Sequence, residues 1–296
     1  TVEHTRLAHG SCRKMHGPAH DALLALDVIL AATQAEDQVR KRPQQLFLTG
    51  DQIYGDDVAD VVLFMLREAQ AVLMGTAWRE ELVALTAPRI APAPLSDAQL
   101  NPGVRQTLAT MNNLSSEHAR SHLLGLAEFY AMYLFAWSPE VWPAMLPAFN
   151  DLFPGEPTHK PNSSDDVRNF LAALPQVRRA LANISCYMMF DDHEITDDWF
   201  LNAAWCQDAL AVGTLSRRVV QNGLAAFAAF QAWGNTPSRF TTRTVGRTIL
   251  DRLENVGRAH GGSASHWDAI AAAIVPEYTA QGLRNQDHTS QGFSWS

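Results

Sequence analysis

Residues 191–198 of this sequence, Asp-Asp-His-Glu-Ile-Thr-Asp-Asp, directly follow an apolar run and hold four aspartates, a glutamate and a histidine. Adjacent carboxylates raise each other's pKa unless a cation lies close to them. No Lys or Arg occurs between Ala180 and Arg217, so a metal ion is the simplest cation to predict here. His193 could donate a proton to a leaving oxygen or bind a metal, and Glu194 could orient its ring or anchor the loop. The alternative is that these acids only cap the start of a helix.

A second acidic motif, Leu-Thr-Gly-Asp-Gln-Ile-Tyr, ends another apolar run at residues 48–54. The Asp51 carboxylate could bridge two cations, as carboxylates do in binuclear hydrolases. Tyr54 could reach the same site as a phenolate ligand or as a hydrogen-bond donor. The alternative is that Asp51 belongs to a turn and caps the helix expected to begin near Asp56.

A third motif, Gly-Ser-Cys-Arg-Lys, follows the first apolar run at residues 10–14. Cys12 could be a thiolate ligand of a metal, or a small buried apolar residue. Arg13 and Lys14 could receive a phosphate group, and they are equally consistent with ordinary surface cations.

These three motifs each end a short apolar segment that predicts a strand, at residues 4–12, 44–52 and 184–192. A helix-like segment follows each of them, at 18–37, 56–75 and 201–235. Repeated strand–loop–helix units predict an α/β fold with a largely parallel sheet. Ligands of such sheets bind beyond the carboxyl ends of the strands. Cys12, Asp51 and the Asp191–Asp192 pair are therefore predicted to meet at one edge of the sheet.

The chain between the second and third strands is predicted to be helical. We expect one domain over 1–296, with residues 56–183 as a helical insertion in it. Two long helices are predicted within this insertion, one over 116–138 with Ser116 as a possible N-cap, and one over 163–184.

Composition excludes several classes of function. Apolar residues make up 47% of the 296 residues and charged residues 18%, so a sizeable core is expected. The net charge of −8 comes without a basic stripe, which argues against a nucleic-acid surface. No run of about 20 apolar residues predicts a membrane span. Three cysteines imply no disulfide framework. No signal peptide is visible, so the chain is either cytoplasmic or exported after loss of a leader; the oligomeric state is not predicted.

The three motifs, Gly-Ser-Cys, Leu-Thr-Gly-Asp-Gln-Ile-Tyr-Gly-Asp-Asp and Phe-Asp-Asp-His-Glu-Ile-Thr-Asp-Asp-Trp, resemble the successive motifs of PhoD-like metallophosphatases. This alkaline phosphatase D group belongs to the calcineurin-like phosphoesterase superfamily. The resemblance spans roughly residues 6–237, and residues 229–237 are similar to a segment of long bacterial members. It implies a four-layer α/β/β/α metallophosphoesterase sandwich, of which this chain supplies one half-sheet.

The resemblance also implies roles for individual residues. Cys12, Asp51 and Asp192 become metal ligands together with Tyr54, and the metals implied are iron and calcium. Asp51 and His193 become the catalytic pair, with His193 as proton donor or transition-state stabiliser. Further residues are expected to surround the site without binding metal: Asp191, Glu194, Asp197 and Asp198. The family usually has two asparagines at the last two positions.

The implied function is hydrolysis of phosphate mono- or diesters by a hydroxide that two metal ions activate. The family's last metal motif, Gly-Asp-x-His, is absent from this sequence. We therefore expect either an N-terminal portion of a longer protein, which would be inactive alone, or a domain with an incomplete site. Two alternatives are a non-catalytic scaffold or binding domain of the same fold, and a helical-bundle metal hydrolase.

Overall fold

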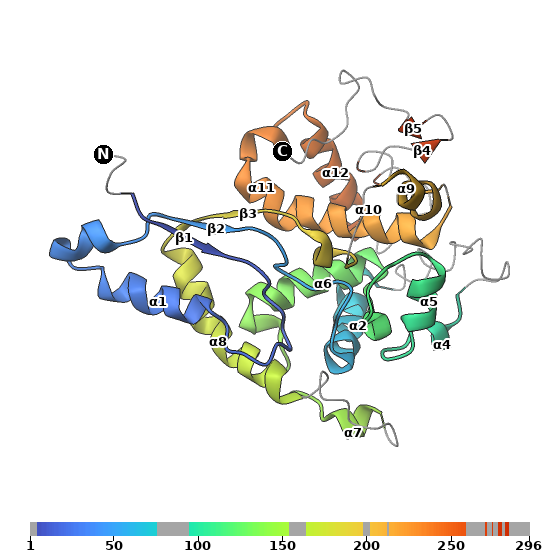
Figure 1. The fold of residues 1–296 in the computed structure, drawn as a ribbon, viewed down its shortest axis with the longest axis horizontal. Coiled ribbons are helices and arrows are strands. Elements are labelled where there is room, and N and C mark those ends of the chain that lie inside the picture. The colour runs from blue at the N-terminus through green and yellow to red at the C-terminus, as the bar shows by residue number, and fades with distance from the viewer. Residues whose placement is uncertain are drawn as a thin grey trace.

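The computed structural model describes residues 5–75, 95–153, 164–197, 202–211 and 213–258, together with 270, 274, 278–279 and 282–283 (Figure 1). Three strands form a parallel sheet in the order β1-β2-β3, with bounds Leu7–Gly10, Gln45–Leu48 and Ser185–Met188. Each strand lies inside one of the three predicted segments, so the predicted α/β fold with parallel strands is confirmed. A separate pair of antiparallel strands, β4 (Tyr278–Thr279) and β5 (Gly282–Leu283), lies late in the chain.

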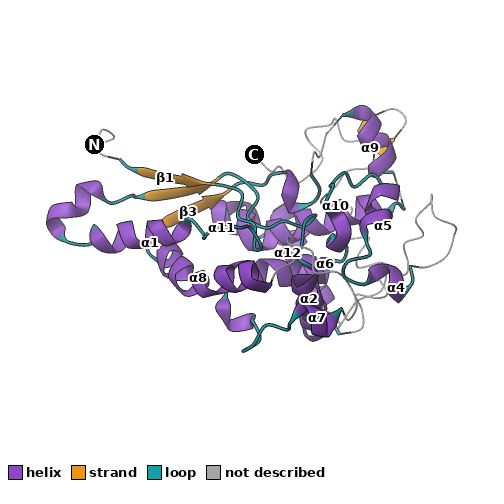
Figure 2. Cartoon of the chain, turned by 60° about the horizontal axis from the view of Figure 1, so that its bottom comes forward, coloured by secondary structure: helices purple, strands orange, loops and turns teal. Residues whose placement is uncertain are grey.

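Two helices cover one face of the parallel sheet, α1 (Leu23–Ala32) and α8 (Ser164–Ala182) (Figure 2). Side chains alternate along a strand, and Leu46 and Leu48 of β2 point to this face. They join an apolar cluster of helix and strand residues: Leu23, Leu26, Leu30, Leu46, Leu48, Ala173, Val177 and Ala180. This burial is what fixes α1 and α8 against the sheet.

The opposite face of the sheet carries exposed apolar side chains. Leu7 is 59% exposed and Tyr187 is 38% exposed, and Tyr187 stacks on Phe47 with ring centroids 5.5 Å apart. Helix α11 (Trp233–Asn235) borders β3, where the Asn235 side chain pairs with both the N–H and the carbonyl of Met188. These bonds satisfy backbone groups at the outer edge of β3.

The remaining helices build a second and larger core at the carboxyl ends of the strands (Figure 1). Helices α2 (Asp60–Met74), α6 (Leu126–Trp137) and α10 (Leu215–Phe227) pack together at its centre. The other helical elements around it are α4 (Asp97–Leu100), α5 (Gln106–Met111), α7 (Phe149–Leu152), α9 (Ala203–Ala209), a π-helical segment (Ala228–Ala232) and α12 (Val245–Arg258). Within the described parts of the chain, none of the helices combines the length and apolar character that crossing a membrane requires.

The helix predicted over 116–138 begins later than expected, at Leu126. Residues Ala119–Ser121 form a short 3₁₀ turn, and the chain then runs on to the N-terminus of α6. The Glu128 carboxylate explains this start, because it accepts the Leu124 N–H at 2.8 Å and pairs with the buried Arg105 at 2.7 Å. A first-turn acid that binds preceding N–H groups sets the beginning of a helix. The prediction over 163–184 is confirmed by α8.

Candidate metal centre

The loops that follow β1 and β2 lie side by side beyond the ends of the strands. The N–H of Cys12 donates to the carbonyl of Gly50 at 3.1 Å, and the N–H of Arg13 donates to the carbonyl of Asp51 at 2.7 Å. The Cys12 thiol donates to Asp51 Oδ2, with Sγ and oxygen 3.3 Å apart. The parallel sheet therefore brings together two of the motifs that the sequence predicted to meet.

The backbone is strained at these two residues. Cys12 has φ 59° and Asp51 has φ 55°, which is the left-handed region that residues with a Cβ rarely occupy. The preceding Gly50 has φ 117°, and a Cβ there would overlap the side chain of Asp191. Strained backbone of this kind costs of order 1–3 kcal/mol per residue and clusters at functional sites. The loops thus hold both side chains in positions that relaxed backbone would not adopt.

The loop after β3 adds the third part of the cluster. Asp192–Glu194 form a single 3₁₀ turn, and such a turn lets two adjacent side chains serve one site, since extended backbone would point them to opposite sides. Asp51, Asp192 and His193 each offer one ligand-type atom, and these atoms all lie within 4.8 Å of one another. This is the spacing expected around a single cation.

Asp51 is the buried member of this cluster, with 4% of its surface exposed. Burial raises the pKa of Asp51, and the charges of Asp191 and Asp192 raise it further, against the Cys12 hydrogen bond and the His193 charge. Its Oδ1 atom is buried and has no hydrogen-bond partner among the described residues. A buried carboxylate oxygen without a donor is costly. These residues therefore fit a metal ion, which would supply the missing partner.

Glu194 ties two of the loops together. Its carboxylate is 1% exposed and accepts three backbone N–H groups, from Asp51 and Gln52 at 2.9 Å each and from Asp191 at 3.0 Å. Burial raises the pKa of Glu194 to about 8, although the N–H bonds oppose that rise. Of the two roles considered for Glu194, the structure supports the anchor of the loop.

Asp56 is a site residue that the sequence analysis treated only as the start of a helix. It is fully buried, and its Oδ2 atom accepts from His193 Nδ1 at 2.9 Å and from the Asp197 N–H at 3.1 Å. The hydrogen bond to Asp56 raises the pKa of His193 to about 9, against the opposing effect of burial. Because Asp56 holds Nδ1, the Nε2 atom of His193 remains for a metal or a substrate.

Tyr54 and Asp197 lie against the His193 ring. The Tyr54 ring stacks on His193 with centroids 4.6 Å apart. Burial, with the neighbouring Asp51 charge, raises the pKa of Tyr54 well above its usual value, so a cation is needed to make it a phenolate ligand. Asp197 Oδ1 lies 3.7 Å from His193 Nε2. Asp191 is exposed at the rim of the cluster, and Asp198 lies outside the described residues.

The structure does not bring Arg13 to the carboxylates. Its guanidinium is buried between the rings of Trp137 and Phe170, 4.4 and 4.5 Å from their centroids. It donates to Asp21 at 2.7 Å and to the Ala136 carbonyl at 2.6 Å. These contacts hold the cation inside the fold, and its Nη2 atom is buried without a hydrogen-bond partner among the described residues, so the contact with a phosphate group stays a prediction.

Lys14 takes the position closer to the cluster. Its Nζ atom lies 5.5 Å from the centroid of the Tyr54 ring and pairs with Asp57. Asp57 also accepts from His16 at 3.2 Å. Burial disfavours the Asp57 carboxylate, but the hydrogen bonds from His16 and Lys14 outweigh it and lower the pKa to about 2.

Comparisons of this chain with protein-family models, with curated proteins and with solved structures gave no match. The resemblance to PhoD-like metallophosphatases therefore rests on the three motifs alone.

Proposed function

We propose that this protein hydrolyses phosphate mono- or diesters with metal ions held by Cys12, Asp51, Tyr54 and Asp192. The observation that carries the proposal is the buried Asp51 Oδ1, which has no hydrogen-bond partner among the described residues although two other ligand-type side chains surround it. A carboxylate in this position calls for a cation.

The charges around the cluster support a cation as well. Two acids at its centre, Asp51 and Asp192, lie beside Asp56 and Glu194, which are both buried. His193 is the basic side chain among them, and Asp56 already binds it. Burial and the neighbouring negative charges raise the pKa of Asp51, and a bound cation would favour its ionised form.

The donor set indicates the kind of metal. A thiolate from Cys12 and a phenolate from Tyr54 suit a transition metal, and the carboxylates of Asp51 and Asp192 suit a hard cation. This combination agrees with the iron and calcium that the family resemblance implies. When bound, such ions lower the pKa of a water molecule and neutralise charge on a phosphoryl group.

The protein's own residues would orient the reaction. Glu194 fixes the Asp51 and Asp191 loops through three N–H bonds, so the ligands are held before any metal binds. Asp56 fixes the His193 ring through Nδ1, which directs a protonated Nε2 outward. His193 in that state can protonate a leaving oxygen. The proposal includes membership of the PhoD-like family and the four-layer sandwich, in which a second sheet covers the exposed face carrying Leu7 and Tyr187.

The test combines metal content with turnover. The protein is purified without chelator and loaded separately with iron, calcium, manganese and zinc, and its metal content is measured by elemental analysis. Hydrolysis is followed with p-nitrophenyl phosphate and bis-p-nitrophenyl phosphate. Asp51→Asn should lose both metal and turnover. Asp27→Asn is the matched control, because Asp27 is an equally buried aspartate that pairs with Arg179, and it should keep both. Wild-type metal content in Asp51→Asn would refute the assignment.

A metal-binding domain without turnover is the second candidate. Two observations favour it: the structure groups three ligand atoms, enough for one ion, and the sequence has no Gly-Asp-x-His motif. If the protein binds metal stoichiometrically, loses that metal in Asp51→Asn and hydrolyses neither ester, the second candidate is the correct one.

A further inference from the structure

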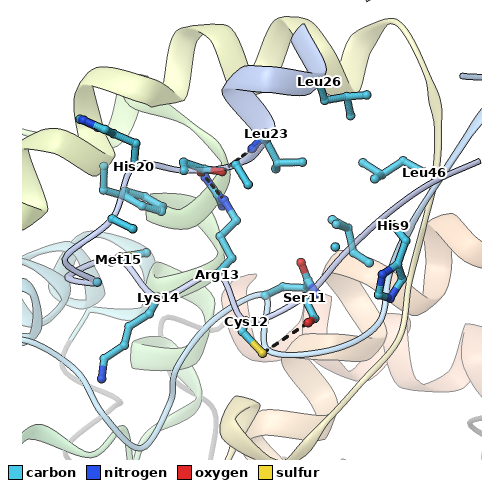
Figure 3. A pocket seen from close by; sticks show the side chains of 18 of the residues that line it. His9, Ser11, Cys12, Arg13, Lys14, Met15, His20, Leu23, Leu26 and Leu46 are labelled. Atoms are coloured by element: carbon cyan, nitrogen blue, oxygen red, sulfur yellow. Dashed lines mark hydrogen bonds and ion pairs between the residues drawn. The ribbon is translucent and has the colours of Figure 1, made fainter. Parts of the chain in front are cut away.

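A pocket of about 400 Å³ lies between the sheet and α1, behind the loop that carries Cys12 (Figure 3). Its volume falls in the range of small-molecule sites. Its apolar wall comes from strand β2 and from both helices of that face: Leu23, Leu26, Leu46, Leu48 and Phe170. Figure 3 shows His9 and Ser11 bordering the pocket across from Leu23 and Leu26, with the Arg13 side chain along one side of it.

The two cations of the wall, Arg13 and Lys14, are each paired with an aspartate, although the Nη2 atom of Arg13 is buried without a hydrogen-bond partner among the described residues. Arg13 pairs with Asp21, with 2.7 Å between nitrogen and oxygen and both side chains buried. Lys14 pairs with Asp57. An ion entering this space would lose its hydration without gaining a free opposite charge from these pairs. The pocket therefore favours an uncharged ligand.

Gln52 gives the pocket a polar contact that the protein does not use. The side chain is 1% exposed and lines the pocket. Its Nε2 atom donates to the Gly50 carbonyl at 2.6 Å, which identifies the other atom as the oxygen. That Oε1 atom is buried and receives no hydrogen bond within the described part of the chain. A buried amide oxygen of this kind is stabilised when a ligand donates to it.

We propose that this pocket binds a small uncharged organic molecule with an apolar body and a hydroxyl group that donates to Gln52 Oε1. The body packs against Leu23, Leu26, Leu46 and Phe170. The site is distinct from the metal centre, because the Cys12 thiol is directed away from the space between the lining side chains (Figure 3). The loop of residues 10–13 separates the two.

The first test fills the pocket. Fluorescence titration of the chelator-treated protein with 1-naphthol should show saturable binding of one equivalent. Leu26→Trp places a large ring in the pocket and should weaken binding at least about tenfold, which is about 1.4 kcal/mol. Val28→Trp is the matched control, because Val28 lies two residues away on the same helix and is 66% exposed; it should bind like the wild type.

A second variant that fills the pocket is needed in case Leu26→Trp does not fold. A Cβ at Gly10 would meet Leu48 Cδ2 at 3.5 Å, an ordinary contact. Gly10→Leu therefore extends into the same space from the strand side and should also weaken binding. Thermal unfolding of each variant checks that it is folded. No saturable binding by the wild type, or equal affinity in the folded Leu26→Trp and Gly10→Leu variants, would overturn the proposal.

The second test addresses the hydroxyl. The wild type should bind 1-naphthol about tenfold more tightly than naphthalene, the size of effect expected for one neutral hydrogen bond in a buried site. Gln52→Met removes the oxygen and keeps the length of the side chain, so this preference should disappear while naphthalene still binds. An unchanged preference in Gln52→Met would refute the assigned contact. Asp51→Asn should bind 1-naphthol like the wild type, which keeps this proposal separate from the metal centre.

Discussion

Replacing Asp56 by asparagine tests how the site holds its histidine. The substitution keeps the size of the side chain and removes the negative charge of the carboxylate. In the wild type, Asp56 Oδ2 accepts a hydrogen bond from His193 Nδ1 at 2.9 Å. That hydrogen bond is the largest cause of the raised His193 pKa, which lies at about 9 against an ordinary 6.5. At 1.36 kcal/mol per pKa unit this interval corresponds to about 3 kcal/mol of stabilisation of the folded state.

The sign of the pH dependence follows from the direction of the shift. A pKa raised on folding stabilises the protein fully below the unfolded value of 6.5, and the stabilisation is lost as the pH rises through about 9. His193 should therefore contribute a loss of about 3 kcal/mol in free energy of unfolding of the metal-free wild type between pH 6 and pH 9.5, in addition to the loss from Glu194, whose pKa is raised to about 8. In Asp56→Asn the pKa of His193 should fall toward its ordinary value, so the loss should shrink by about the 3 kcal/mol that His193 contributes, and the Glu194 part should remain.

The assay uses chelator-treated protein. Urea unfolding at several pH values gives the free energy of unfolding, and NMR titration of the histidine ring protons gives the pKa of His193. Asp60→Asn is the matched control: Asp60 is also buried, but it accepts from Ser121 at 2.5 Å. It should lower stability evenly across the pH range and leave the His193 pKa unchanged. A wild-type His193 that titrates near 6.5, or an Asp56→Asn variant with the wild-type slope, would refute the reasoning.

Three further predictions concern the surrounding residues. The lowered pKa of Asp57, about 2, contributes stability that is present above pH 3.8 and is lost as the pH falls toward 2; Asp57→Asn should therefore cost about 2 kcal/mol at pH 5 and much less near pH 2 by urea unfolding. Gly50→Ala should lower the melting temperature and the metal content, because its Cβ has no room, whereas Gly234→Ala, where a Cβ meets nothing within 4 Å, should do neither. If the proposed function holds, His193→Ala should slow esters with poor leaving groups by roughly 10²–10⁴-fold and activated aryl esters much less, with metal retained. Asp192→Ala should instead lose metal and slow every substrate alike; equal slowing of both ester types in His193→Ala would contradict the role of proton donor.

The parts of the site that local sequence predicts are those on the strand ends. Short apolar runs that end in Gly-Ser-Cys, Gly-Asp and Asp-Asp predict buried parallel strands, and parallel strands place their carboxyl ends at one edge. That rule predicts, without any tertiary information, that Cys12, Asp51 and Asp192 lie near one another.

The parts that the sequence did not predict depend on contacts between distant segments. Asp56 meets His193 across 137 positions of the chain, and Glu194 binds Asp51 across 143. A Gly-Asp-Asp before an apolar helix is equally typical of a helix start, so the local pattern contains no sign of the histidine. The burial of Arg13 was not predicted for the same reason: Trp137 and Phe170, which lie against its guanidinium, belong to helices that only the folded chain brings near.

The buried acids around His193 divide into two kinds, and this division accounts for their density. Both carboxylate oxygens of Glu194 accept hydrogen bonds from backbone N–H groups. Both carboxylate oxygens of Asp56 also accept hydrogen bonds, from His193 and from the N–H groups of Asp57 and Asp197. These two carboxylates hold the loops in place. Asp51 keeps one buried oxygen that no described group satisfies. The unsatisfied oxygen of Asp51, within ligand distance of Asp192 and His193, is therefore the observation that supports the proposed cation site over a turn that only caps a helix.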